Sequence, residues 1–277
     1  MVKLSFLLYL FIAIDVYAYF WTNIPEENSL RLIKQFATAP SKDHHKLLLW
    51  NIFKNRKPSF KSELKRIRNQ FSPDIFLFQE VPYSYTDEKK ELKEEICLPE
   101  SDCFVGLAFK FSNPLTRNYE RYGVLTSSIF KISKPEVIQS KNFEPVINTT
   151  KSTLLTIIEG PREDLLLINT HAINFTLTEH YTAQLQEVVN AVESFNGPII
   201  WASDFNSWSY QRVETLNKIT KQLGLKELEI KNSHLIKSFI GFPLDKVFYR
   251  GISRIKGEAL SSTGSDHNPI IIEYFLD

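Results

Sequence analysis

The sequence predicts an α+β fold in which two packed β-sheets carry helices on their outer faces. Strand-like segments outnumber helical ones, and many of them alternate apolar and polar residues, as half-buried strands do. The 277 residues, 43% of them hydrophobic, are enough for one sizeable core. No repeat, low-complexity run or long Gly/Pro/Ser linker divides the chain. We therefore expect one main domain over residues 46–277.

The N-terminus is typical of an exported protein. Residues 1–18 resemble a secretory signal peptide, with an apolar run over 4–14 and Ala18 as a small residue at a cleavage point. The alternative is an uncleaved membrane anchor, because Tyr17 makes the cleavage site imperfect. Either way we expect a periplasmic or extracellular protein, free or held at a membrane. Residues 19–45 are polar and are interpreted as a leader or linker.

Two cysteines, Cys97 and Cys103, are the only ones in the chain. In an oxidising compartment they could close a small disulfide loop. The alternative is two unrelated thiols, because spacing in the sequence does not give the distance between Cα atoms. If the protein is exported, the disulfide is favoured.

Helical periodicity marks four segments: residues 60–71, 85–96, 176–195 and 208–223. The third opens with Thr176 and Glu179, spaced as in a capping box. The fourth stops at Gly224, a residue type that suits the position after a helix end. These helices separate the strand candidates from one another along the chain.

Polar side chains repeatedly follow apolar, strand-like runs. The runs end at Asn51, Glu80, His171 and Asp204, and a polar stretch over 265–268 precedes the strand near the C-terminus. Each end taken alone fits a strand followed by an ordinary turn. Their recurrence predicts one cleft lined by carboxylates, amides and imidazoles. Carboxylate and amide oxygens suit Mg²⁺ or Mn²⁺, whereas two cysteines and no HExxH spacing give no zinc signature.

These strand ends carry a family resemblance. The ordered motifs are WN, QE, TH, DFN, LD and SDHNP, over about residues 46 to 276. Together they resemble the endonuclease/exonuclease/phosphatase superfamily, which is DNase I-like, and more narrowly the bacterial YafD-like branch. The resemblance implies a four-layer α/β/β/α sandwich and metal-dependent phosphoester hydrolysis, without naming the substrate. One departure is Ser203, which stands where the family commonly has Gly.

The resemblance also implies a metal site. Glu80 corresponds to the main metal ligand, with Asn51 and Asp266 nearby, and the expected cofactor is Mg²⁺ or Mn²⁺. The alternative for a Glu at a strand end is a solvated residue at the rim of the sheet. The expected reaction is attack of water on a phosphodiester, which needs a cation, a base and support for the leaving group.

Five further residues match catalytic positions of the family. His267 corresponds to the histidine at the scissile phosphate, and Asp245 to the carboxylate that orients it. Asp204 would activate or position the water, and Asn206 would donate an amide hydrogen to a phosphoryl oxygen. His171 would support the phosphate or the leaving group.

Substrate identity is the least determined feature of the sequence. Lys54 and Arg56 follow the Asn51 strand end directly and are candidates for phosphate contact, and Asn174 is a candidate for lining the cleft. The net charge of +1 gives no global basic field, so nucleic-acid binding would need a local patch. We expect a monomeric phosphodiesterase of the nuclease type. The alternatives are a lipid or small-molecule phosphoesterase of the same fold and a non-catalytic binding module.

Overall fold

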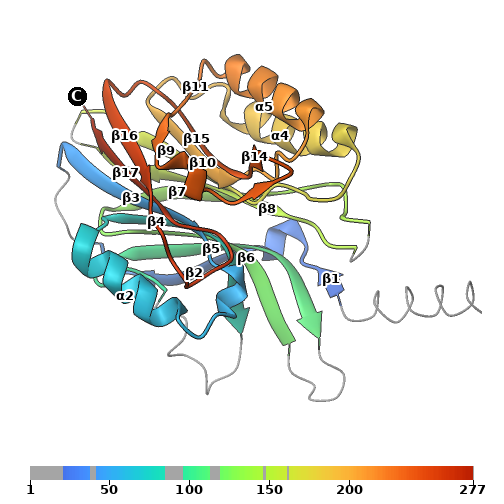
Figure 1. The fold of residues 1–277 in the computed structure, drawn as a ribbon, viewed down its shortest axis with the longest axis horizontal. Helices are drawn as coiled ribbons and strands as arrows, with labels where there is room; N and C mark the ends of the chain where they lie inside the picture. The colour runs from blue at the N-terminus through green and yellow to red at the C-terminus, as the bar shows by residue number, and fades with distance from the viewer. Residues whose placement is uncertain are drawn as a thin grey trace, which may run out of the picture.

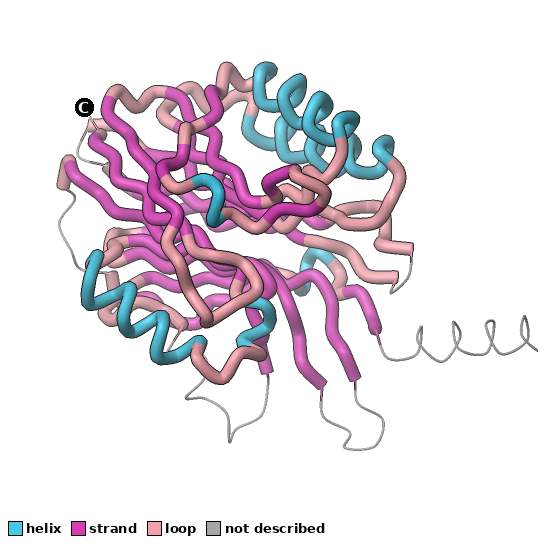
Figure 2. Tube along the Cα trace, in the orientation of Figure 1, coloured by secondary structure: helices cyan, strands magenta, loops and turns pink. Residues whose placement is uncertain are grey.

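The computed structural model describes residues 21–37, 42–84, 96–112, 119–145, 148–160 and 162–276. Within them, two large sheets pack face to face with helices outside, so that the predicted four-layer α/β/β/α sandwich is confirmed (Figures 1 and 2). None of the helices among these residues is long and apolar enough to cross a membrane. The predicted signal peptide or anchor lies outside the described residues.

The first sheet has nine strands among the described residues, in the order β1-β5-β6-β4-β3-β17-β16-β12, with β2 also paired to β5. β3 and β4 are parallel neighbours, which places Asn51 beside Gln79. The strands are β1 (Trp21–Asn23), β2 (Leu30–Gln35), β3 (His44–Asn51), β4 (Ile75–Ser84), β5 (Asp102–Ser112), β6 (Tyr119–Ser128), β12 (Ile230–Lys231), β16 (Arg254–Ala259) and β17 (Ile270–Phe275).

The second sheet has six strands among these residues, in the order β11-β15-β10-β9-β8-β7. The strands are β7 (Ile132–Gln139), β8 (Ser152–Ile158), β9 (Leu165–Thr170), β10 (Ile199–Asp204), β11 (Lys226–Glu227) and β15 (Asp245–Arg250). A separate hairpin joins β13 (Ser238–Phe239) to β14 (Phe242–Pro243). Short 3-10 helices cover Glu26–Asn28, Phe53–Asn55 and Ser233–Leu235.

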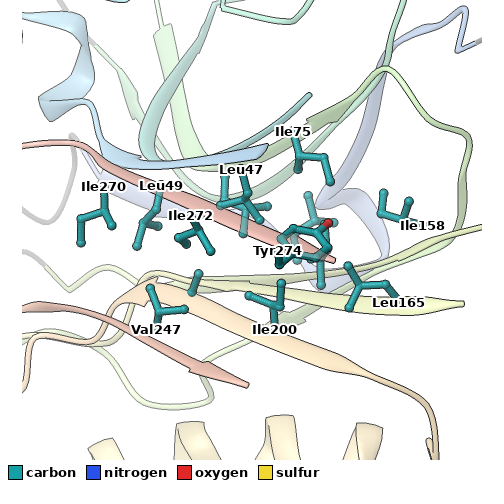
Figure 3. Packing of buried hydrophobic residues seen from close by; sticks show 14 of the residues in the cluster. Leu47, Leu49, Ile75, Ile158, Leu165, Ile200, Val247, Ile270, Ile272 and Tyr274 are labelled. Atoms are coloured by element: carbon teal, nitrogen blue, oxygen red, sulfur yellow. The ribbon is translucent and has the colours of Figure 1, made fainter. Parts of the chain in front are cut away.

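Alternation along the strands builds three apolar layers. In β3, Leu47 and Leu49 point into the core between the sheets, whereas Leu48 and Trp50 point to the outer face under helix α2 (Phe60–Phe71). Figure 3 shows the central layer, where side chains of both sheets meet. Helices α4 (Thr178–Val192) and α5 (Tyr210–Gln222) cover the outer face of the six-stranded sheet. Strand side chains of period two therefore supply both the core and the helix contacts.

The segment interpreted as a leader or linker, residues 19–45, differs from that prediction. β1 and β2 pair with β5, and His44 and His45 already lie in β3. The polar composition was misleading because these edge strands are half-exposed and need few apolar residues. Part of this segment is therefore a structural component of the nine-stranded sheet.

The predicted local features have mixed outcomes. Cys97 and Cys103 form a disulfide, with Cα atoms 6.1 Å apart. The capping box at α4 is wrong: the N-cap residue is Leu177, without a side-chain hydrogen bond, and the Thr176 hydroxyl instead lies 2.9 Å from His180 Nδ1. Gly224 has φ +66° just after α5, as its predicted role requires. The helix predicted over 85–96 falls almost entirely outside the described residues.

Candidate active site

One hydrogen bond joins the two sheets at the centre of the site. Asn51 is the last residue of β3 in the nine-stranded sheet, and Asp204 is the last residue of β10 in the six-stranded sheet. Asn51 Nδ2 donates to Asp204 Oδ2 at 2.9 Å, and both residues are buried. The strand ends therefore converge, as the recurrence of polar residues predicted.

Glu80 is delivered to this point by an irregularity in its strand. The β4–β6 register shifts between Phe78 and Val81, and Glu80 has φ +54°. A left-handed conformation is uncommon for a residue with a side chain, and strained positions in bulges often serve sites. Glu80 Oε1 lies 3.5 Å from Asn51 Nδ2 and 3.9 Å from His171 Nε2. The bulge thus turns this carboxylate toward the groups of both sheets.

Asp204 and Asn206 share one face, and the buried Phe205 lies between them in the core, as predicted. Asp204 Oδ1 accepts a hydrogen bond from Asn206 N at 3.1 Å, and Asn206 has φ +47°. Asn206 Nδ2 donates to the Ala172 carbonyl at 2.9 Å. Because a side-chain amide carries two hydrogens, Asn206 retains one for a ligand in the cleft.

His267 is held between two carboxylates. Its Nδ1 lies 2.8 Å from Asp245 Oδ2, and its Nε2 lies 3.9 Å from Asp204 Oδ2. Burial would lower the pKa of His267, but Asp245 and then Asp204 outweigh it and raise that pKa to about 10. The imidazole is therefore protonated at neutral pH. The Trp50 indole donates to the His267 carbonyl at 2.9 Å and fixes the loop.

The pKa values of Asp204 and His171 are shifted in opposite directions, and each shift favours the neutral form of the side chain. Burial, aided by Asp245, raises the pKa of Asp204 to about 7, although His267 and Asn51 oppose the rise. Burial, followed by the nearby Lys151, lowers the pKa of His171 well below its ordinary value. His171 is therefore neutral, with Nε2 3.7 Å from Asp204 Oδ2. The site combines a protonated imidazole, a neutral imidazole and a carboxyl group that titrates near neutrality.

The oxygen-rich part of the site fits a hard divalent cation. Glu80 and Asp266 both line the cleft, and Asn51 Nδ2 lies 3.5 Å from Glu80 Oε1. Asp266 is exposed and lines the same cleft, where Lys237 Nζ lies 3.1 Å from its Oδ2. Oxygen donors of this kind suit Mg²⁺ or Mn²⁺.

A second group of possible ligand atoms lies beside that set. One ligand atom each of Asp204, Asp245 and His267 lie within 4.8 Å of one another. His267 Nδ1 already shares a 2.8 Å hydrogen bond with Asp245, which fits orientation of the ring better than metal ligation.

Of the two cations predicted to contact phosphate, Lys54 lines the cleft and Arg56 does not. Lys54 lines the cleft, with its Nζ 3.7 Å from Glu80 Oε2, and burial lowers its pKa. Arg56 lies over the Phe53 ring and is not among the described residues that line the cleft. Asn174 lines the cleft, but its Oδ1 accepts from Trp208 Nε1 at 2.8 Å, so it also positions that indole.

The cleft has a volume of about 570 Å³ and includes groups that the motifs did not reveal. Lys151 and Glu144 are both buried, with Nζ and Oε2 3.4 Å apart. Lys151 lies directly before the buried strand β8, whereas the predicted site residues lie at the ends of such strands. A charged residue at the start of a buried strand is the signal by which the sequence could have indicated it. Phe175, Trp208 and Phe239 also line the cleft.

Comparison with known proteins agrees with this geometry. Residues 48–267 match the model of the endonuclease/exonuclease/phosphatase family. A UPF0294 protein of Vibrio parahaemolyticus is 31% identical over 240 residues, which cover 83% of this chain and 78% of that protein.

Solved structures share the fold at low sequence identity. The Bacteroides thetaiotaomicron mannosyl-6-phosphatase has a TM-score of 0.60 at 15% identity, covering 84% of this chain and 100% of that one. TDP2 of D. rerio, complexed with a single-strand DNA product, has a TM-score of 0.60 at 14% identity, covering 84% of this chain and 99% of that one.

Proposed function

Because this chain belongs to the endonuclease/exonuclease/phosphatase family, we propose that it is a phosphodiesterase that depends on Mg²⁺ or Mn²⁺. The observation that carries this proposal is the hydrogen-bonded set that spans both sheets: Asn51, Glu80, Asp204, Asp245 and His267. A binding module that had lost catalysis would not need these groups to be complete or their pKa values to be shifted apart.

The metal would be held by the carboxylates of Glu80 and Asp266. Asn51 would add its Oδ1, which accepts from Phe53 N at 3.0 Å, only if its amide turned, because its Nδ2 now faces Glu80 and Asp204. When bound, the metal would neutralise charge on the phosphoryl oxygens and lower the pKa of a bound water. This role requires Asp266 to exchange its contact with Lys237 for the cation.

The protein side chains supply the remaining steps. Asp204, whose pKa lies near 7, accepts a proton from the attacking water. The protonated His267 donates to a phosphoryl oxygen or to the leaving oxygen, while Asp245 holds its ring. The free amide hydrogen of Asn206 and the neutral His171 add donors where negative charge develops.

The substrate class within phosphoesters is a separate question. The nuclease hypothesis drew on Lys54 and Arg56, and of these only Lys54 lines the cleft. The structural neighbours include a mannosyl-6-phosphatase and a protein in complex with a single-strand DNA product, so the shared fold does not by itself favour a small or a polymeric phosphoester. Export of the protein remains a prediction from residues 1–18.

A panel of DNA, RNA, phospholipid, a phosphomonoester and a soluble chromogenic phosphodiester tests the proposal. We expect hydrolysis of diesters with Mg²⁺ or Mn²⁺, none with EDTA, and none by Glu80→Ala. Glu214→Ala is a matched control, because Glu214 is an exposed carboxylate on α5 that pairs with Lys218. Full activity in EDTA would exclude the metal, and hydrolysis of the monoester alone would exclude a diesterase.

A further inference from the structure

A continuous apolar surface borders one side of the cleft. This apolar rim consists of Phe175, Leu177, Trp208, Phe239 and Ile240. Three members are mostly exposed: Phe175 at 62%, Leu177 at 65% and Ile240 at 78%. Trp208 lies between two other members, with its ring centroid 6.2 Å from that of Phe175 and 6.3 Å from that of Phe239. Clusters of exposed large apolar side chains commonly mark binding surfaces.

The rim belongs to the same cleft as the catalytic groups. Phe175, Trp208 and Phe239 line the cleft together with Asp204 and His267. Leu177 lines an adjoining depression that shares Phe175 and Trp208 with the cleft. A molecule whose phosphate reaches the catalytic groups would therefore carry its neighbouring atoms past the rim.

Local structure does not account for two of the rim residues. Phe175 and Ile240 have φ values of +45° and +49°. Ile240 and Gly241, φ +81°, connect the paired residues Phe239 and Phe242, which is a two-residue hairpin turn with both φ values positive. Such turns favour Asn-Gly, and a β-branched residue is strained there. The preference of the turn therefore does not explain an exposed isoleucine at this position.

The rim is held in place before any ligand arrives. Asn174 Oδ1 accepts from Trp208 Nε1 and from Phe175 N at 2.8 and 2.9 Å. The buried Glu144 in turn accepts from Asn174 N at 2.7 Å. The Arg212 guanidinium lies 4.7 Å from the centre of the Trp208 ring. A preformed apolar surface loses little conformational entropy when it binds.

The charges of the cleft are a poor match for a long polyanion. Among the described residues, three lysines line the cleft and lie close to carboxylates: Lys54 to Glu80 at 3.7 Å, Lys151 to Glu144 at 3.4 Å and Lys237 to Asp266 at 3.1 Å. Binding of nucleic acid depends on cations that neutralise successive phosphates. Leucine and isoleucine at the most exposed positions also offer no flat face for base stacking. A substrate that has a single phosphodiester next to apolar chains fits both observations.

We propose that the apolar rim inserts into the surface of a phospholipid bilayer and presents the cleft to lipid phosphodiesters. This inference rests on the proposed phosphodiesterase activity for its catalytic part, but membrane insertion is independent of it. In the reaction, water oxygen bonds to phosphorus, the bond from phosphorus to one ester oxygen breaks, and that oxygen takes up a proton. Side chains at the tips of a hairpin and a helix start can reach the interfacial region without further folding.

The test uses the double variant Leu177→Ser with Ile240→Asn in the full chain. Neither residue lines the catalytic cleft, and both changes favour the local backbone: Ser suits the N-cap of α4, and Asn suits the left-handed turn. Leu32→Ser with Phe36→Ser is the matched control, because these residues are 50% and 66% exposed and lie in or beside β2 of the other sheet. Any contribution of the N-terminal segment is the same in all three proteins.

Partition is measured on vesicles of phosphatidylethanolamine and phosphatidylglycerol, and hydrolysis on those vesicles and on the soluble chromogenic diester. We expect the rim variant to lose at least about tenfold in partition and vesicle hydrolysis, which is what removal of two inserted apolar side chains predicts. Its melting temperature should match or exceed that of the wild type, its ratio of vesicle hydrolysis to soluble-diester hydrolysis should fall, and the control variant should behave as the wild type.

Unchanged vesicle partition and hydrolysis in the rim variant would overturn the proposal. It would also be overturned if the rim variant lost cleavage of single-stranded DNA or RNA while the wild type ignored vesicles, since the rim would then bind nucleic acid. Failure of the catalytic proposal has a different signature: no hydrolysis of any phosphoester, with rim-dependent partition intact.

Discussion

Replacing Asp245 with asparagine should lower the pKa of His267 and change the pH dependence of catalysis. The rise of that pKa from 6.5 to about 10 corresponds to about 5 kcal/mol in favour of the protonated ring. Asp245, whose Oδ2 lies 2.8 Å from Nδ1, is the larger source, and Asp204 at 3.9 Å from Nε2 is the smaller. Without Asp245, only Asp204 and Asp266 oppose the lowering effect of burial, so the pKa of His267 should fall.

The sign of the effect follows from the protonated role of His267. In the wild type the proton is retained up to about pH 10, so stability from this group is present below pH 6.5 and is lost as the pH rises through about 10. In Asp245→Asn we expect the ring to lose its proton at a lower pH, so that less of it is protonated at pH 8. We expect kcat to fall by up to about four orders of magnitude there, with little change in KM and partial recovery toward pH 5.5.

The assay is kcat and KM on a soluble phosphodiester from pH 5.5 to 9 at saturating metal, together with an NMR titration of the His267 ring. A thermal melt of each variant controls for folding, because Asn retains an oxygen that can accept from Nδ1. A variant within about twofold of the wild type across the whole profile would refute a catalytic role for the pair. An unchanged ring titration would refute the electrostatic explanation.

Three further predictions concern stability. Burial lowers the pKa of His45 to about 4, so the free energy of unfolding should fall by up to about 3 kcal/mol as the pH falls from 6.5 to 4. Urea unfolding at pH 7.5 and at pH 4.5 should show a smaller fall in His45→Phe than in the wild type. An equal fall in both proteins would contradict this prediction. Replacing Cys97 and Cys103 with serine should lower the free energy of unfolding by about 2 kcal/mol, and equal urea midpoints with and without reductant in the wild type would count against it. Gly123→Ala should lower the free energy of unfolding by more than about 2 kcal/mol, because an added Cβ would meet the Gly106 carbonyl oxygen at 2.0 Å and force β5 and β6 apart. A calorimetric melting temperature within about 1 °C of the wild type would be inconsistent with that contact.

Much of the fold followed from local patterns. Apolar residues every third or fourth position marked α2, and runs such as 46–51 and 165–170 marked central strands, because burial on one or both faces shows directly in sequence periodicity. The edge strands β1 and β2 escaped detection because the β2 side chains are at most partly buried and because the partner of both strands, β5, lies more than sixty residues away in the sequence.

The sequence by itself determined which polar residues end the strands and in which order, since each of Asn51, Glu80, His171 and Asp204 lies within three positions of the last residue of an apolar run. Family resemblance added the pairing of His267 with Asp245, which the 2.8 Å contact confirms. Only the tertiary structure decided the rest.

The hydrogen bond from Asn51 to Asp204 requires two sheets to meet, and the bulge at Glu80 depends on its register with β6. The apolar rim unites Phe175 before α4 with Ile240 in a distant hairpin. Such contacts join residues far apart in sequence, and no local periodicity encodes them, because their energy comes from sheet packing rather than from the conformational preference of any one segment.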